Sequence, residues 1–168
     1  MTTSATSPAS LPAFDPATGA LPAGDYYPTQ ADFEARFVHV TSTTRLAIHE
    51  GATRHASDLA TAGVPGQAPC LLNGSYTTNK VDPGDIDLVV EVDEALYLAS
   101  PVVQTLLAGP AVKSTHHCDA YPIVVLPAGH PDYKAVTEDA RTFWHTFFGK
   151  DRANRAKGRV WRTVAGFR

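Results

Sequence analysis

The chain has 168 residues, of which 43 % are hydrophobic and 18 % charged, a composition that suits a folded domain and excludes a disordered or fibrous chain. No run approaches the roughly 18 apolar residues of a transmembrane helix. Residues 1–10 lack the basic start and apolar core of a secretory signal, so we expect a cytoplasmic protein. Two cysteines, Cys70 and Cys118, are too few for a disulfide framework, lack metal-ligand spacing and are expected to be reduced, small residues at strand positions.

The net charge of −3 is unevenly distributed along the chain. Residues 141–168 hold eight of the 14 basic residues and a single acid, so this segment carries +7 and the rest of the chain −10. An acidic body with a basic end fits a metal site that binds an anionic ligand, and it fits a solvated terminal helix equally well. The basic segment is therefore a candidate contact for RNA or for a protein partner.

The first 28 residues contain five prolines together with Gly19 and Gly24, which excludes a regular element there. We expect residues 1–12 to be disordered. Phe14, Leu21 and Tyr26 indicate that the rest of this stretch packs as an extended arm on the domain, which would then span residues 13–168.

Two helices are predicted next. Thr29 and Asp32 have the spacing of a capping box, in which the acid reaches back to the cap amide. A second helix is predicted over residues 42–62 and should end at Gly63. Its buried side is expected to carry Leu46, Ala47 and Leu59, and its exposed side Arg45, Glu50, Arg54 and Asp58.

The remaining segments alternate between strand and helix patterns. Strands are predicted over residues 68–73, 85–92 and 117–126 and an edge strand over 158–164, with helices over 94–107 and from Thr137 to Gly149. Phe143, Trp144, Phe147 and Phe148 have helical spacing and are expected to be core, not a base-stacking platform. This order predicts an α+β fold: a small mixed sheet with flanking helices.

Three aspartates are the candidate catalytic residues. Asp85 and Asp87 lie two apart on a predicted strand, so both point to one side of the sheet while Ile86 and Leu88 point to the other. A fold keeps two carboxylates this close only if a cation neutralises them, if solvent surrounds them, or if one of them is protonated. Asp119 belongs to the next predicted strand and would complete a set of oxygen ligands for Mg²⁺ or Mn²⁺.

Two other features bear on this site. Gly74 and Ser75 follow a predicted strand, where a sharp glycine turn exposes backbone amides and a hydroxyl to phosphate oxygens. His116 and His117 are adjacent and would face opposite ways on a strand, so they are not expected to bind one metal, although His117 would share the face of Asp119.

Gly74-Ser75, nine intervening residues and Asp85-Ile86-Asp87-Leu88 resemble the signature of the DNA polymerase β-like nucleotidyltransferase superfamily, and Asp119 matches its third acid. The resemblance implies a mixed sheet with flanking helices, a nucleoside triphosphate held at Gly74 and Ser75, and metal ions on the three aspartates. Further segments resemble a small stand-alone bacterial branch of unknown function: residues 14–15, 19–24, 73–78, 147–149 and 157–158.

The sequence departs from that family where a basic residue commonly follows the serine. Tyr76-Thr77-Thr78 stand there, so Lys80 and Lys157 are the candidate triphosphate-binding cations. The expected activity is transfer of a nucleoside monophosphate from NTP to a hydroxyl of tRNA, protein or a small molecule. Small members of the superfamily resemble toxin–antitoxin or defence components. The alternatives are a catalytically silent NTP-binding or antitoxin-like module and a metal-dependent phosphodiesterase.

Overall fold

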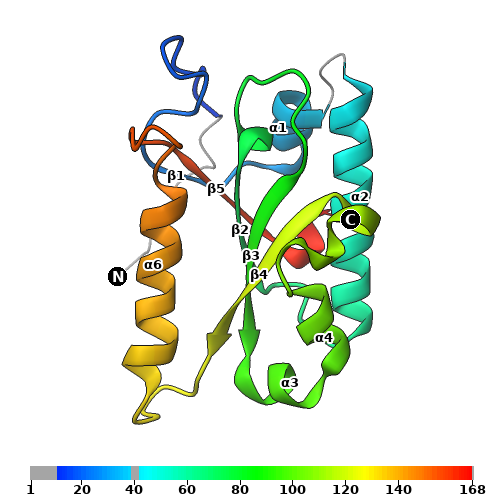
Figure 1. Cartoon of the computed structure of the whole chain (residues 1–168), viewed down its shortest axis with the longest axis vertical. Coiled ribbons are helices and arrows are strands. Elements are labelled where there is room, and N and C mark those ends of the chain that lie inside the picture. The colour runs from blue at the N-terminus through cyan, green and yellow to red at the C-terminus, as the bar shows by residue number, and fades with distance from the viewer. Residues whose placement is uncertain (1–10, 39–41, 168) are drawn as a thin grey trace, which may run out of the picture.

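A five-stranded mixed sheet in the order β1-β5-β2-β3-β4 forms the centre of the protein (Figure 1). The computed structural model describes residues 11–38 and 42–167. The strands are β1 (Asp25–Tyr26), β2 (Pro69–Asn73), β3 (Ile86–Asp93), β4 (Cys118–Val125) and β5 (Arg159–Thr163). The predicted α+β class with a small mixed sheet is therefore confirmed.

Helices flank both faces of the sheet, with α2 on one side and α6 on the other (Figure 1). The α-helices are α1 (Gln30–Phe33), α2 (Thr43–Thr61), α3 (Glu94–Ala99), α4 (Pro101–Leu106), α5 (Lys113–His116) and α6 (Asp139–Phe148). Single π-helical turns continue α1 over Glu34–Val38 and precede α6 over Lys134–Glu138. Short 3-10 turns cover Ser75–Thr77, Pro110–Val112 and Val164–Phe167.

Strand register decides which side chains can meet at the end of the sheet. β3 and β4 are parallel, with Asp87 opposite Asp119, and β2 runs antiparallel to β3, with Asn73 opposite Asp87. Both faces of β3 are buried: Ile86, Leu88 and Val90 pack toward α2, as predicted, and Val89 packs toward α6. The three adjacent strands β2, β3 and β4 thus bring polar residues together at one end of the sheet, above a hydrophobic core.

The N-terminal stretch packs against the domain from Leu11 onward. Leu11 is buried, and the Arg36 guanidinium donates to the carbonyl oxygens of Leu11 and Pro12 at 3.0 and 2.7 Å. Most of the segment predicted to be disordered, residues 1–10, lies outside the described residues. The exclusion of regular structure before residue 29 was wrong for β1, which pairs in parallel with β5.

Both predicted helix starts after this stretch are confirmed. The Thr29 and Ser42 hydroxyls accept hydrogen bonds from the backbone N–H of Asp32 and Arg45. The Asp32 carboxylate accepts from the Thr29 hydroxyl at 2.7 Å, in place of the cap amide expected from the sequence.

The exposed and buried sides predicted for α2 were partly wrong. Leu46 and Ala47 are exposed, whereas Arg45 is buried. The buried face carries Ile48, Ala52, His55, Ala56 and Leu59. The difference is confined to the first turn, where the Arg45 guanidinium binds carbonyl oxygens of loops distant in sequence, which helical periodicity does not reveal; Leu59 is buried and Glu50, Arg54 and Asp58 are exposed, as predicted.

Three further boundaries differ from the predictions. The helix predicted over 94–107 is two helices, because Ser100 turns into an extended conformation before Pro101 and caps a new helix. Thr137 is not a helix cap: it is buried, and its hydroxyl binds the backbone of Val124 and Leu126. β5 is not an edge strand, because β1 pairs along its outer side.

Within residues 11–38 and 42–167, no helix combines the length and hydrophobicity needed to cross a membrane. Cys70 lies in β2 and Cys118 in β4, and both are free, as expected; both are also buried.

Candidate active site

Three aspartates meet at one edge of the sheet, as the sequence predicted. Asp85 immediately precedes β3, Asp87 lies within β3, and Asp119 is aligned with Asp87 on the neighbouring parallel strand. Neighbouring strands are about 4.8 Å apart, so aligned side chains on the same face are in close proximity. We call Asp85, Asp87 and Asp119 the carboxylate cluster.

Burial and mutual repulsion shape the electrostatics of this cluster. Burial, and then the negative charges of Asp85 and Asp119, raise the pKa of Asp87 to about 6. The Oδ1 atom of Asp119 is buried and has no hydrogen-bond partner among the described residues. The cluster therefore has an excess of negative charge and an acceptor that nothing in this part of the chain satisfies.

Lys113 is the cation that touches the cluster from outside. Its ammonium forms an ion pair with Asp85 and lies 3.5 Å from Oδ2 of Asp119. It is the first residue of α5, on the segment that leads into β4, and its side chain remains 46 % exposed. Sequence reasoning assigned no role to Lys113, because it lies outside the signature and no periodicity points it toward the aspartates.

Beside the cluster, residues 73–75 form a sharp turn, which we call the glycine turn. Gly74 has a φ of +80°, a conformation that side-chain-bearing residues rarely adopt. A Cβ at this position would collide with the carboxylate of Asp87. The predicted glycine therefore serves two needs: it permits the backbone turn, and it lets Asp87 lie directly against the chain.

Lys157 fixes the glycine turn from beneath. It is only 5 % exposed; its ammonium donates to the Gly74 carbonyl at 2.6 Å and also to the Asn73 side-chain oxygen. Asn73 in turn accepts from the Gly74 amide at 2.7 Å and donates to the Phe148 carbonyl at the end of α6. Burial lowers the pKa of Lys157 to about 8, although the charge of Asp87 acts in the opposite direction. Lys157 thus lies at the site, as predicted, but its contacts are with the protein backbone and Asn73.

The loop after the turn is held by Arg45, a residue that the sequence analysis placed in water. The guanidinium of Arg45 donates to the carbonyl oxygens of Tyr76, Thr78 and Lys80 at 2.6–3.1 Å and to that of Phe37 at 3.2 Å. It also lies 5.1 Å from the centre of the Tyr76 ring. The segment that resembles a triphosphate-binding loop is therefore anchored by a buried cation.

The other two predicted nucleotide-binding residues are placed differently. Ser75 begins the 3-10 turn and is partly exposed, and its carbonyl accepts from the Thr78 hydroxyl at 2.7 Å. Lys80 is exposed, and the contacts that the structure shows for it within residues 11–38 and 42–167 run through its backbone, to Arg45 and to the Thr78 hydroxyl. Ser75 is adjacent to the glycine turn, whereas no contact brings the Lys80 ammonium to the cluster.

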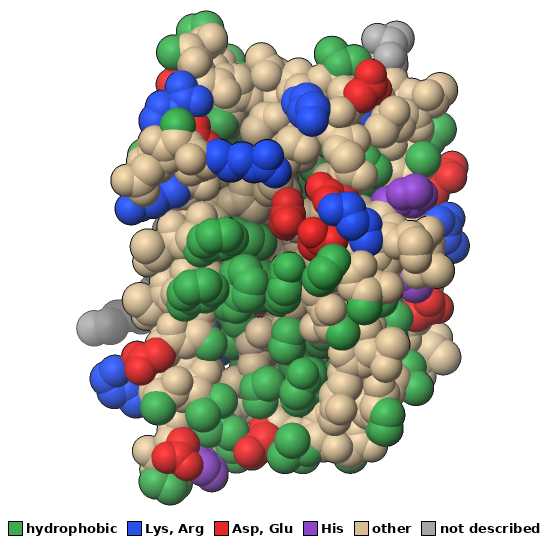
Figure 2. All heavy atoms as spheres, viewed as in Figure 1, with side chains coloured by type: hydrophobic (Ala, Val, Ile, Leu, Met, Phe, Trp, Pro, Cys, Tyr) green, Lys and Arg blue, Asp and Glu red, His purple; other side chains and the backbone are tan. Residues whose placement is uncertain are grey.

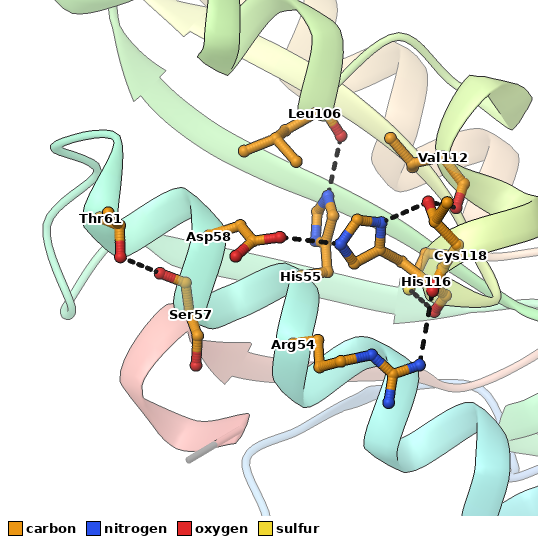
Figure 3. A network of polar contacts seen from close by, with 10 residues as sticks. Arg54, His55, Ser57, Asp58, Thr61, Leu106, Val112, His116 and Cys118 are labelled. Atoms are coloured by element: carbon orange, nitrogen blue, oxygen red, sulfur yellow. Dashed lines mark hydrogen bonds and ion pairs between the residues drawn. The ribbon is translucent and has the colours of Figure 1, made fainter.

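The two adjacent histidines do not lie on a strand as expected. His116 ends α5, and its Nε2 lies 2.9 Å from the Asp58 carboxylate of α2 (Figure 3). His55 of α2 contacts the Leu106 carbonyl oxygen at 2.8 Å. His117 adopts a left-handed conformation, and its carbonyl accepts from the amide of Ile86 at 3.1 Å. The His116 contact joins α5 to α2 and the His117 hydrogen bond joins the residue before β4 to β3, so the backbone around Lys113 is firmly positioned.

The carboxylate cluster has the donor atoms, but not the arrangement, that the divalent cation implied by the resemblance requires. Three carboxylates and an unsatisfied Asp119 oxygen are the hard oxygen donors that Mg²⁺ and Mn²⁺ prefer. As arranged, however, no group of three or more His, Cys, Asp or Glu among the described residues could hold a metal ion. The donor atoms therefore suit a divalent cation chemically. With the Lys113 ammonium between them, however, they are not arranged as a coordination shell for a metal ion.

The basic C-terminal segment is mostly engaged within the protein. Arg141 pairs with Glu91, Arg155 with Asp151 and Arg159 with Asp25. Lys157 and Arg162 are buried. Among the described basic residues of this segment, Lys150 and Arg152 are exposed, and the contact with RNA or a protein partner stays a prediction.

An apolar surface adjoins the acidic group, as Figure 2 shows for one face of the molecule. The side chains of Phe143 and Phe147 on α6 are 57 % and 60 % exposed and stack on each other at 5.8 Å, whereas Phe148 is buried. The prediction that all these aromatic residues are core was wrong, because α6 covers its face of the sheet alone and only its inner side is enclosed. Tyr121, two residues after Asp119, packs against Trp144 at 5.0 Å and extends this surface to the cluster.

Comparison with known proteins gives a family but no activity. Residues 12–162 match the family of unknown function DUF6932, so the chain belongs to that family. No curated protein and no solved structure matches the chain.

Proposed function

We propose that this member of DUF6932 is a metal-dependent nucleotidyltransferase with a fold like that of the DNA polymerase β superfamily. Its reaction transfers a nucleoside monophosphate from NTP to an acceptor hydroxyl. The observation that carries the proposal is the alignment of Asp87 with Asp119 on parallel strands, with Asp87 packed directly against Gly74. The glycine turn, where the polyphosphate would bind, is thus an immediate neighbour of the carboxylate cluster.

Each part of the site has a role in this reaction. Asp85, Asp87 and Asp119 would hold Mg²⁺ or Mn²⁺, which supplies charge neutralisation at the triphosphate and lowers the pKa of the acceptor hydroxyl. The partly exposed Ser75 hydroxyl and the backbone of the glycine turn would bind phosphate oxygens. Asn73, Lys157 and Arg45 position that turn, because their bonds fix its carbonyl groups.

The transfer itself is an in-line displacement. The acceptor oxygen forms a bond to the α-phosphorus while the bond from that phosphorus to the bridging oxygen breaks, releasing pyrophosphate. Oδ1 of Asp119 accepts the hydroxyl proton in this scheme, because this buried oxygen has no other partner among the described residues. A hydroxyl of tRNA, protein or a small molecule satisfies the chemistry equally.

A second candidate function has its own support. The Lys113 ammonium lies between Asp85 and Asp119, and the Lys157 ammonium is bonded to the Gly74 carbonyl. Neither of these cations is therefore free to bind a triphosphate at the glycine turn. These observations favour an NTP-binding or antitoxin-like module that forms no product. A metal-dependent phosphodiesterase would use the same acids but leaves the glycine turn unexplained.

Calorimetric titration with ATP and GTP in the presence of Mg²⁺, together with pyrophosphate release on tRNA, protein and small hydroxyl acceptors, separates these functions. Asp119→Asn should abolish pyrophosphate release, and Asp132→Asn, whose side chain is 70 % exposed, serves as the matched control. Binding without release on every acceptor would favour the silent module. Release that survives in Asp119→Asn would contradict the proposed site.

A further inference from the structure

Two lysines face the carboxylate cluster, and their freedom to move differs greatly. Lys157 is 5 % exposed and bonded to Asn73 and Gly74, whereas Lys113 is 46 % exposed. The contacts of the Lys113 ammonium that the structure shows are with Asp85 and Asp119 alone. A lysine side chain has four methylene groups and rotates freely when its tip is solvated. The Lys113 ammonium can therefore leave its position without disturbing the core, and that of Lys157 cannot.

The base of Lys113 is nevertheless fixed. The backbone N–H of His117 donates to the Lys113 carbonyl at 2.9 Å, and His116 contacts Asp58 of α2 (Figure 3). Gly51 of α2 lies so close to the His116 carbonyl that a Cβ there would collide with it. A movement of Lys113 is therefore confined to its side chain, which turns about a fixed point beside the cluster.

Charge balance shows what happens when a divalent cation arrives. The Lys113 ammonium already bridges two of the three carboxylates and repels any second cation at that place. The two cannot share the Asp85 and Asp119 oxygens, so the metal enters only as the ammonium leaves. The absence of a ready metal-binding group among the described residues agrees with this arrangement.

A nearby anion would give the displaced ammonium a new partner. Residues 76–78 of the loop after Ser75 supply no basic side chain, Tyr76 and Thr77 are buried, and the Lys157 ammonium is already bound to the Gly74 carbonyl. Lys113 is the half-exposed cation already at the cluster, adjacent to the place where the proposed function puts the triphosphate. A bound polyphosphate therefore stabilises the displaced lysine and in doing so vacates the metal position.

We propose that Lys113 is an exchangeable counter-cation, which neutralises Asp85 and Asp119 in the free protein and moves to the polyphosphate when the divalent metal binds. Metal and polyphosphate then bind with positive coupling, and each raises the affinity of the other by the same factor. This inference rests on the proposed function. It adds a specific role for Lys113 as the residue that prevents tight metal binding in the absence of nucleotide.

The test is a titration of the full-length chain with Mn²⁺ alone, followed by calorimetry or by the electron paramagnetic resonance of free Mn²⁺. Lys113→Met keeps most of the aliphatic stem and removes the charge, and should bind Mn²⁺ at least tenfold more tightly than the wild type. Lys113→Gln is a second variant that retains polarity and should change affinity in the same direction. Lys134→Met is the matched control, because Lys134 is exposed and pairs with the distant Asp139.

A second titration uses preformed complexes of Mg²⁺ with a non-hydrolysable ATP analogue. Lys113→Met should bind this complex more weakly than the wild type, since the triphosphate has lost its cation. Opposite signs in the two titrations are a result that a purely structural role of Lys113 would not produce.

The outcomes distinguish the two proposals. If the wild type binds Mn²⁺ through Asp119 and Lys113→Met binds it no more tightly, the counter-cation role is wrong and the proposed function stands. If neither the wild type nor Lys113→Met binds Mn²⁺, both proposals are overturned. Tighter Mn²⁺ binding combined with unchanged binding of the nucleotide complex would overturn the transfer of the lysine to the polyphosphate.

Discussion

On the glycine-turn side of the site, the cations Arg45 and Lys157 are buried and bind backbone carbonyl groups, whereas on the carboxylate side an exposed lysine bridges like charges. On the glycine-turn side, the buried cations have their hydrogen-bond acceptors within the protein. The carboxylate side retains an unsatisfied Asp119 oxygen and an Asp87 whose pKa is raised to about 6. The glycine-turn side is thus fixed by contacts within the protein, whereas the carboxylate side keeps unbalanced charge and an unsatisfied acceptor.

Because the glycine-turn side depends on buried cations, we expect Arg45→Met to cause the largest loss of stability at the site. Removing the guanidinium leaves several carbonyl oxygens without their donor, and we expect a loss of about 3–5 kcal/mol in the free energy of unfolding. Urea denaturation measures it. Arg54→Met, an exposed position on the same helix, should change stability by less than about 1 kcal/mol. Equal effects of the two variants would show that the loop does not depend on Arg45.

Lys157→Met should have the next largest effect, a loss of about 2–3 kcal/mol near pH 10.5, where charging the buried lysine no longer costs stability and the Gly74 carbonyl still loses its buried donor; the loss should be smaller at pH 7. Burial lowers the pKa of Lys157 to about 8 from 10.5, so between these values the unfolded chain binds more protons than the folded one. Wild-type stability should therefore gain from this group as the pH rises from 8 to 10.5, and the variant should lack that gain. Urea midpoints across this range measure it, with the exposed Lys150→Met as control. Parallel pH profiles for wild type and Lys157→Met would refute the prediction.

On the carboxylate side the sign reverses, and Asp87→Asn should stabilise the protein at pH 7 by about 1–2 kcal/mol. The pKa of Asp87 is raised from 3.8 to about 6, so the folded chain binds more protons than the unfolded one within this window. Stability contributed by the protonated group is present below pH 4 and is lost as the pH rises through 6. Thermal unfolding at pH 4, 5, 6 and 7 should show a decline in the wild type that the variant lacks. A destabilised Asp87→Asn at pH 7 would mean that the carboxylate has a favourable partner.

The smallest effect is expected on the apolar surface below the cluster. Phe143→Ser and Phe147→Ser should each change the free energy of unfolding by less than about 1 kcal/mol, because both rings are more than half exposed. Phe148→Ala, one residue away but buried, should cost about 3–5 kcal/mol. Urea denaturation of the three variants measures the contrast. A large loss from either serine variant would show that this surface is covered in solution.

Local sequence patterns predicted much of this protein. The α+β class, the strands β2, β3 and β4, the caps at Thr29 and Ser42 and the convergence of Asp85, Asp87 and Asp119 were all predicted. They follow from the period of two along a strand, from capping chemistry and from strand order. These features depend on residues close in sequence or on neighbouring strands, so local pattern is enough to find them.

Other features were decided by the tertiary structure. The burial of Arg45, the exposure of Phe143 and Phe147 and the bridge made by Lys113 depend on which surfaces face each other after packing. No periodicity encodes a guanidinium that binds carbonyls about 30 residues away, or a helix that covers one face of a sheet alone. A cation's role is set by the acceptors that surround it in space, and only the folded chain brings those acceptors to it.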